Sequence, residues 1–213
     1  MKKLLLLGAA FMAFSFTHPS ITPNTVKPDE GVVRSVQNEK AFLLDYYQQT
    51  EDRLKEQLDG LSSAQLQFKP SADSWSISQC VEHIIKTEKM LFGMAKEAMA
   101  KPANPERKAE VAVTDQQLID GITDRSHKAE APAALLGEGA YTDVDAAMAD
   151  FRAQRKVILS YIKDVAVDDL RNHIADSPFG PVDGYHSMLF IAGHTARHTL
   201  QIEEVKSNAA FPK

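Results

Sequence analysis

Apolar residues recur at helical spacing in four long stretches of the chain. In the first, from about residue 39 to residue 58, they return every three or four positions, and the second runs from Ser76 to near Pro102. A third follows Thr142, and the fourth spans about residues 185–207. This period indicates amphipathic helices, and no stretch of useful length alternates as a half-buried strand would. The pattern predicts an all-α fold, a four-helix bundle.

The buried faces of these helices follow from the same spacing. One apolar stripe is expected on each helix, turned toward a common core. On the first helix it comprises Leu43, Tyr46, Tyr47, Leu54 and Leu58, and on the third Ala147, Phe151, Ile158, Ile162 and Val165.

Local signals mark where the predicted helices begin and end. Ser76 and Gln79 have the spacing of a capping box ahead of the second helix. Thr142 and Asp145 repeat a box-like spacing ahead of the third helix. Gly60 is expected to end the first helix, because glycine is favoured just past a helix C-terminus. These signals place the helix ends within a few residues.

The connections between the long helices differ in length. A loop containing Pro70 separates the first two helices, and a break between residues 178 and 184 precedes the last. The longest connection begins with a linker, 101–113, continues with a short extra helix at about 114–127, and ends with a loop at 129–141. We therefore expect the bundle to carry one short extra helix between its second and third long helices.

The N-terminus has the layout of a secretory signal peptide. Lys2 and Lys3 precede an uncharged apolar run, Leu4–Phe16. The run is shorter than the ~20 residues of a transmembrane helix, although an uncleaved signal anchor stays open as an alternative. We expect a signal peptide at 1–20, a tether at 21–38 and one domain at 39–213, exported to the periplasm or the medium.

The net charge limits the expected binding partners, and the cysteine count excludes an internal disulfide. The formal net charge is −5, and it becomes −7 once Lys2 and Lys3 are removed with the signal. Nucleic acid and anionic membranes attract cationic proteins, so neither is an expected partner. We also expect no stable membrane span after the signal is removed. A small molecule is the expected partner, with a homodimer left open. The lone Cys80 cannot form an internal disulfide and is expected to be a buried thiol.

Two histidines on the last helix form a candidate metal-binding pair. His194 and His198 are four residues apart, which places both imidazoles on one helix face. By helical phase they lie with Ile191, Gln201 and Val205 and point inward, where they need hydrogen-bond partners or a metal. A structural or exposed pair is the alternative, because this spacing is common. Thr195 follows His194, so the H-E-x-x-H motif of zinc proteases is absent.

His83 on the second helix is the third candidate ligand. It lies at the border of the apolar face, a position that suits a side chain lining a cleft. Alone it would be an ordinary interfacial histidine. Together with the pair on the last helix it would give three neutral imidazoles, the donor set of a catalytic divalent metal with open coordination positions.

Four segments resemble the DinB-like family. They are WSISQCVEH at Trp75–His83, GHTARHTLQIEEV at Gly193–Val205, LxxLSSAQL at Leu58–Leu66, and the terminal FPK. The similarity runs from about residue 39 to the C-terminus. It implies a four-helix bundle that holds a metal by one histidine on the second helix and two on the last, which here are His83, His194 and His198. Nickel or zinc is the implied occupant, with iron and manganese as further candidates.

The resemblance leaves the reaction open, because the family includes thiol transferases, presumed hydrolases and members of unknown activity. We favour a metal-dependent hydrolase of unknown substrate, in which the ion activates water. The alternative is a non-catalytic bundle that binds a metal or small ligand outside the cytoplasm. Thiol transfer ranks last, since an exported protein lacks abundant small thiols.

No catalytic residue is assigned beyond the metal ligands, and four polar residues stay open. Glu88 falls on the apolar face of the second helix and is expected to form a buried ion pair, with Arg197 or another cation, or else to orient a ligand imidazole. Gln201 could hydrogen-bond a metal-bound water or pack between helices. Tyr46 and Tyr47 could present hydroxyls to the cleft, although core packing is favoured.

Overall fold

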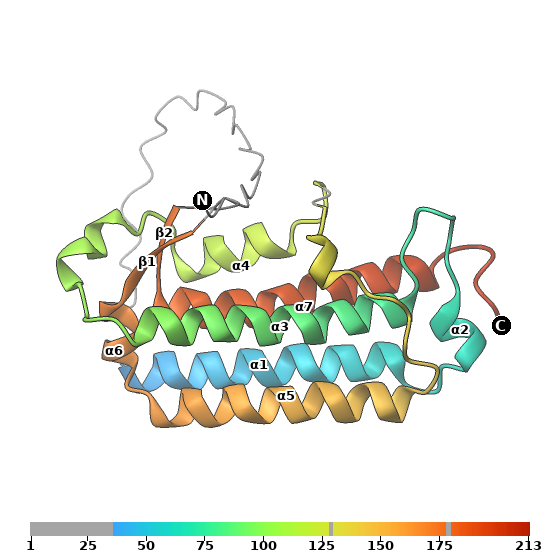
Figure 1. Ribbon diagram of the computed structural model, residues 1–213, viewed down its shortest axis with the longest axis horizontal. Helices are drawn as coiled ribbons and strands as arrows, with labels where there is room; N and C mark the ends of the chain where they lie inside the picture. The colour runs from blue at the N-terminus through green and yellow to red at the C-terminus, as the bar shows by residue number, and fades with distance from the viewer. Residues whose placement is uncertain (1–35, 128–129, 178–179) are drawn as a thin grey trace, which may run out of the picture. The chain divides into compact units, whose positions relative to one another are not determined.

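Four long helices lie side by side in the computed structural model of the protein (Figure 1). The structure describes residues 36–127, 130–177 and 180–213. α3 packs against α7 and α5, and α1 packs against α7 and α5, so that the four helices enclose one core. The predicted four-helix bundle is confirmed. The long helices are α1 (Val36–Leu58), α3 (Ile77–Met99), α5 (Val144–Asp164) and α7 (Gly184–Lys206).

Short elements fill the connections, and most of them were not predicted. The loop expected around Pro70 is preceded by a five-residue helix, and a six-residue helix and a two-stranded antiparallel hairpin lie between α5 and α7. Elements of three to six residues are too short to show a period in the sequence. The predicted extra helix is confirmed as α4. The bounds are α2 (Ser63–Gln67), η1 (Pro105–Glu110, a 3₁₀ helix), α4 (Asp115–Thr123), η2 (Ala133–Leu135, 3₁₀), α6 (Val167–Asn172), β1 (Ile174–Ser177) and β2 (Gly180–Asp183).

The N-terminal boundary differs slightly from the expectation. α1 begins at Val36, three residues before the predicted helix start at about Glu39. The signal peptide predicted at 1–20, with His18, lies outside the described residues, as does the tether up to residue 35.

Capping side chains explain where α3 and α5 begin. The Gln79 backbone N–H donates to Ser76 Oγ, and the Ser76 N–H donates to Gln79 Oε1, so the predicted capping box is confirmed. At α5 the prediction was wrong by one residue. Asp143 is the N-cap, and its carboxylate accepts the backbone N–H of Ala146. A carboxylate at this position also interacts favourably with the positive end of the helix dipole, which a threonine hydroxyl does not.

Replacing Ser76 with alanine should lower the free energy of unfolding by about 1 kcal/mol, because the Gln79 backbone N–H at the start of α3 loses its acceptor, the Ser76 hydroxyl. Urea unfolding measures the change. Ser76→Asp keeps an acceptor at the cap and should remain close to the native protein. Equal loss in both variants would show that the hydroxyl matters for packing rather than for capping.

The predicted apolar stripes form the core. Leu43, Tyr47, Leu54 and Leu58 of α1 have no exposed surface. On α5 the stripe is buried as far as Ile162, whereas Val165 is only partly buried because it is the C-cap of the helix. Tyr47 also places its hydroxyl within the core, where it donates to the carbonyl of Met188 at 2.9 Å. The expectation of a packing role for this tyrosine is therefore confirmed.

A buried ion pair links the helices through the centre of this core. The side chains of Glu88 on α3 and Arg155 on α5 are 0% and 1% exposed and approach to 2.7 Å. Thr195 of α7 donates its hydroxyl to Glu88 Oε1, and Arg155 donates to Thr50 Oγ1 of α1. The predicted buried pair is confirmed, but the cation is Arg155. We call these side chains the Glu88 network; they fix the register of all four long helices.

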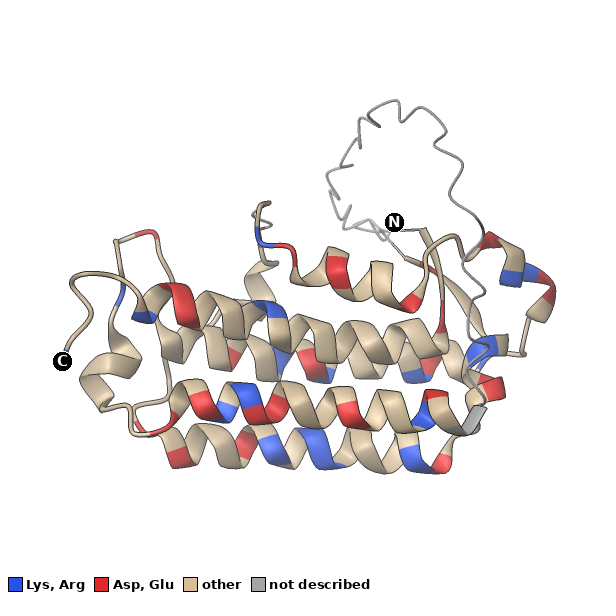
Figure 2. Ribbon diagram, turned by 180° about the vertical axis from the view of Figure 1, so that it is seen from behind, with Lys and Arg blue, Asp and Glu red and all other residues tan. Residues whose placement is uncertain are grey.

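Acidic and basic residues are interleaved on the outer faces of the bundle. Figure 2 shows residues of both signs along α1 and α5. Some pair between helices, such as Arg53 with Glu203 and Arg152 with Glu51. Exposed pairs of this kind contribute little to stability individually. None of the described helices has an apolar stretch long enough to cross a lipid bilayer.

Candidate metal centre

The packing of α3 against α7 brings three histidines together. His83 lies in the second turn of α3, and His194 and His198 are one turn apart on α7. One side-chain nitrogen of each lies within 4.8 Å of the other two. The Nε2 atoms of His83 and His194 are 3.3 Å apart. The structure thus assembles in one cluster the three residues that the sequence singled out, although His83 and His194 are 111 residues apart in the chain.

Hydrogen bonds at the opposite ring nitrogens orient two of these imidazoles. His83 Nδ1 lies 2.8 Å from the carbonyl oxygen of Leu135, and His198 Nδ1 lies 2.8 Å from Gln201 Oε1. A carbonyl oxygen only accepts, so each Nδ1 carries the proton and each Nε2 presents its lone pair. Nδ1 of His194 is buried with no hydrogen-bond partner among the described residues. Gln201 therefore orients the imidazole of His198. This contact differs from both expected roles, a hydrogen bond to a metal-bound water and packing between helices.

Burial keeps the three rings neutral. Desolvation lowers the pKa of His198 to about 3, with a further contribution from the neighbouring His83. It also holds the pKa of His194 well below its usual range, assisted by His198. For His83, burial lowers the pKa and outweighs the opposing hydrogen bond to Leu135. Neutral imidazole is the form that coordinates a metal ion, so no proton has to be removed near neutral pH.

Trp75 forms one wall of the cluster. Its ring stacks on His198 at a centroid distance of 6.0 Å and 13° between planes, and it meets His83 edge-on at 4.9 Å. The residue precedes the N-cap of α3, so the capping box of that helix also fixes the position of this ring. Trp75 is the single tryptophan of the chain. Its fluorescence consequently reports on events at these imidazoles.

The donor set fits a divalent transition-metal ion. Metal–nitrogen distances of about 2.0–2.1 Å place two imidazole nitrogens about 3.4 Å apart at a tetrahedral ion. The 3.3 Å between His83 and His194 agrees with that separation. Three nitrogen donors leave at least one coordination position for water or substrate, as in catalytic zinc sites. Within the described residues, no carboxylate or thiolate belongs to the cluster.

Arg197, on the same helix as the histidine pair, points away from the Glu88 network. Its guanidinium donates to the backbone carbonyls of Ile122, Asp124 and His127, at the C-terminal end of α4. It thereby fastens α4 and the following residues to α7. Of the cations left open for Glu88, the partner is therefore Arg155 and not Arg197, whose guanidinium is engaged by these carbonyls.

The other residues considered from the sequence lie outside the cluster. His186 donates from Nε2 to Asp115, and His173 is held between the backbone carbonyls of Asp169 and Lys101. Tyr46 packs against the core. Cys80 is buried as expected, and burial raises the pKa of its thiol to about 12. None of these side chains belongs to the histidine cluster.

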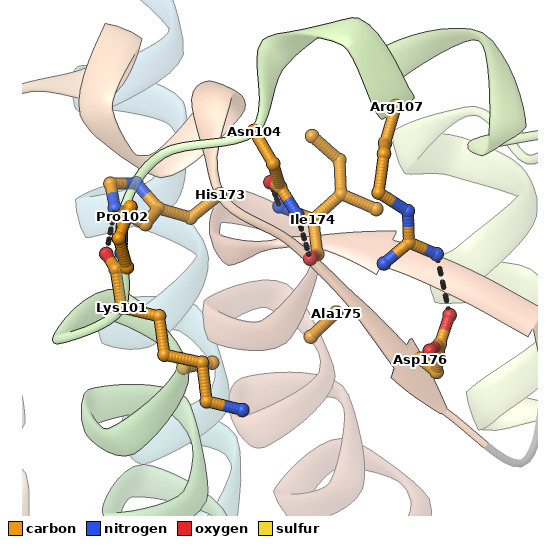
Figure 3. Close-up of a pocket in the computed structure, with 9 residues that line it drawn as sticks. Lys101, Pro102, Asn104, Arg107, His173, Ile174, Ala175 and Asp176 are labelled. Atoms are coloured by element: carbon orange, nitrogen blue, oxygen red, sulfur yellow. Dashed lines mark hydrogen bonds and ion pairs between the residues drawn. The ribbon is translucent and has the colours of Figure 1, made fainter.

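A separate hollow lies at the far end of α3, about 22 Å along that helix from His83 at 1.5 Å per residue. It encloses about 310 Å³. Figure 3 shows that several of its polar groups are already paired with one another: Asn104 with the backbone of Ile174, and Arg107 with Asp176. Groups satisfied in this way do not converge on a ligand, so this hollow is a weaker candidate than the histidine cluster.

Metal-free protein should lose stability as the pH falls below about 6.5. The histidines titrate near 6.5 in the unfolded chain, whereas the pKa of His198 is about 3 in the folded protein. The unfolded chain therefore binds more protons in this window, which lowers the free energy of unfolding by up to about 1.4 kcal/mol per pH unit for each histidine. Urea unfolding with a chelator between pH 5 and 7 measures the slope. His198→Gln should make it shallower, and an unchanged slope would contradict suppressed protonation of His198.

The chain belongs to the DinB superfamily, whose model matches residues 46–202, well over half of the chain and including all three histidines. The uncharacterised protein YuaE of Bacillus subtilis (strain 168) is 24% identical over 150 residues, which cover 70% of this chain and 88% of YuaE. YfiT from Bacillus subtilis, described as a probable metal-dependent hydrolase with an unusual four-helix bundle topology, matches with a TM-score of 0.57. Its sequence is 12% identical, and the match covers 88% of this chain and 95% of YfiT. At that identity the likeness shows a shared fold.

Proposed function

We propose that the protein is a metal-dependent hydrolase of a small molecule, with one divalent ion held by His83, His194 and His198. The cluster of three neutral imidazoles carries the proposal, because hydrogen bonds at Nδ1 already orient two of them. The fold shared with YfiT, a probable metal-dependent hydrolase, supports the same class of reaction. Zinc and nickel are the first candidates for the ion, followed by iron, since imidazole suits all three; manganese comes last, because it prefers oxygen ligands.

A divalent ion on three imidazoles would supply an activated water, because it lowers the pKa of a bound water to about 7. The chain's own residues prepare the site. Burial keeps the ligand imidazoles unprotonated, and Leu135 and Gln201 fix two of their rings. Trp75 covers one side of the cluster with an apolar surface. Together these contacts give a rigid, partly shielded site.

A non-catalytic metal- or ligand-binding bundle is the second candidate. One observation favours it: the carboxylates nearest in sequence to His83 are engaged elsewhere. Glu82 binds Lys86 and backbone N–H groups, and Glu88 binds Arg155 and Thr195. Neither belongs to the cluster as a general base for water.

Hydrolysis of small esters, amides and lactones by the zinc- or nickel-loaded protein tests the two candidates. The hydrolase proposal expects turnover that a chelator abolishes and that returned metal restores. Metal-loaded protein that turns over no member of the panel would favour the binding role. A His173→Ala variant, altered at the far end of the bundle, should retain the activity of the native protein.

We also propose that the mature protein acts outside the cytoplasm. Lys2 and Lys3 followed by the apolar run Leu4–Phe16 support export. N-terminal sequencing of the protein recovered from periplasm or medium should find a start near residue 20. Full-length chain confined to the cytoplasm would contradict export.

A further inference from the structure

Polar side chains on one face of α3 hold the end of the α4–α5 connection beside the metal centre. This segment, residues 135–141, we call the strap. It contains Leu135, whose carbonyl accepts the Nδ1–H of His83. The α3 side chains that bind backbone groups of the strap are Ser78, Gln79, Glu82, His83 and Lys86.

Glu82 makes the densest of these contacts. Its Oε2 accepts three consecutive backbone N–H groups, from Glu138 at 2.8 Å, Gly139 at 3.0 Å and Ala140 at 3.2 Å. Its Oε1 lies 2.7 Å from Lys86 Nζ. Successive backbone N–H groups that converge in this way form a nest for an anion, and here the protein's own carboxylate fills it.

The charge of Glu82 agrees with these contacts. Burial by itself raises the pKa of the carboxyl, but the hydrogen bonds from Lys86 and from the strap outweigh it and hold the pKa below its usual value. A carboxylate that stays ionised keeps all three charge-assisted hydrogen bonds near neutral pH.

Close backbone approach fixes the strap in a second way. A Cβ atom on Gly137 would lie 2.2 Å from the carbonyl oxygen of Gln79, so only glycine allows the strap to come this near α3. Gly139 has a positive φ of 82°, which turns the chain so that successive N–H groups face Glu82. Both glycines thus serve the same arrangement as the carboxylate.

We propose that Glu82 is a positioning residue for the metal centre: by anchoring the strap, it places the Leu135 carbonyl that orients the His83 ring. Glu138, the first strap residue bound by Glu82, is only three residues from Leu135. Loss of the Glu82 contacts should therefore shift the Leu135 carbonyl. Partners of this kind fix the tautomer and orientation of a ligand imidazole, and their removal costs about 10–100-fold in metal affinity. The inference rests on the proposed metal site.

Zinc and nickel affinities of the full mature chain, measured by chelator competition, test the role. Glu82→Ala should weaken binding by about 10–100-fold, and Glu82→Gln, whose amide oxygen still accepts N–H bonds, should recover most of the loss. Gly137→Ala should also weaken metal binding, although it removes no polar group. If Glu82→Ala does not fold, Gly137→Ala alone tests the role of the strap. ¹H–¹⁵N spectra of the metal-free protein should show His83 as the Nδ1–H tautomer in the native chain and as a mixture in Glu82→Ala.

A core variant separates positioning from general destabilisation. Ile158→Val, in a fully buried position outside the strap, should lower the melting temperature yet leave the metal affinity and the His83 tautomer unchanged. Equal affinity in the native chain, Glu82→Ala and Gly137→Ala would overturn the positioning role, as would equal losses in Ile158→Val and Glu82→Ala. A native chain that binds neither zinc nor nickel would instead overturn the proposed function itself.

Discussion

Replacing His198 with alanine should weaken binding of the divalent ion by far more than the about 10–100-fold that loss of an outer contact costs. The variant leaves two imidazoles where three converge, and it also frees Gln201, which holds the ring of His198. Because Trp75 stacks on the His198 ring in the native protein, quenching of Trp75 fluorescence by nickel reports metal binding at the cluster, and the variant should lose this quenching. Chelator competition with zinc gives the affinity.

His173→Ala is the matched control for this loss. Its imidazole lies between two backbone carbonyls at the far end of α3, outside the cluster. The control should bind one ion per chain with the affinity of the native protein. Undiminished affinity in His198→Ala would remove this histidine from the ligand set.

Replacing Arg155 with methionine should give the largest loss of stability, about 3–5 kcal/mol, because it leaves the carboxylate of Glu88 buried and unpaired. In a domain of this size, each kcal/mol lost from the free energy of unfolding lowers the melting temperature by about 2–4 °C. The melting temperature should therefore fall by about 6–20 °C. Calorimetry and urea unfolding of the metal-free protein measure the change.

The double variant Glu88→Leu/Arg155→Met tests the cause of that loss. Apolar residues of similar volume often replace a buried ion pair without loss, so the second substitution should recover most of the stability. Two equally unstable variants would show that the Arg155 contacts to the rings of Tyr47 and Phe151, rather than the unpaired charge, account for the effect.

The bundle could be predicted because its helices are long enough to show their period. The stripe from Ala147 to Ile162 is buried where the spacing placed it, and the Ser76–Gln79 box starts α3 as expected. The cap of α5 could not be chosen in the same way, because Thr142, Asp143 and Asp145 all carry suitable oxygens. In the structure it is the Asp143 carboxylate that accepts a backbone N–H of the first turn, from Ala146.

The histidine side chains of the candidate site could be predicted from the sequence. The backbone groups that orient them could not. His83, His194 and His198 could be singled out by helical phase together with resemblance. The Leu135 carbonyl that holds His83 has no sequence signature, since every residue carries a carbonyl. Two glycines in the strap were the available signal, and the close approach of Gly137 to α3 shows their purpose. The partner of Glu88 was equally hidden, because Arg155 lies 67 residues away on another helix.

X-ray absorption spectroscopy of the zinc- or nickel-loaded protein, combined with elemental analysis, tests the central claim most directly. The account predicts about one ion per chain, with three imidazole nitrogens at about 2.0–2.1 Å and the remaining ligands oxygen. Loss of one imidazole contribution in His198→Ala would complete the assignment. A first shell without imidazole, or substoichiometric metal in the native protein, would contradict a metal centre built from His83, His194 and His198.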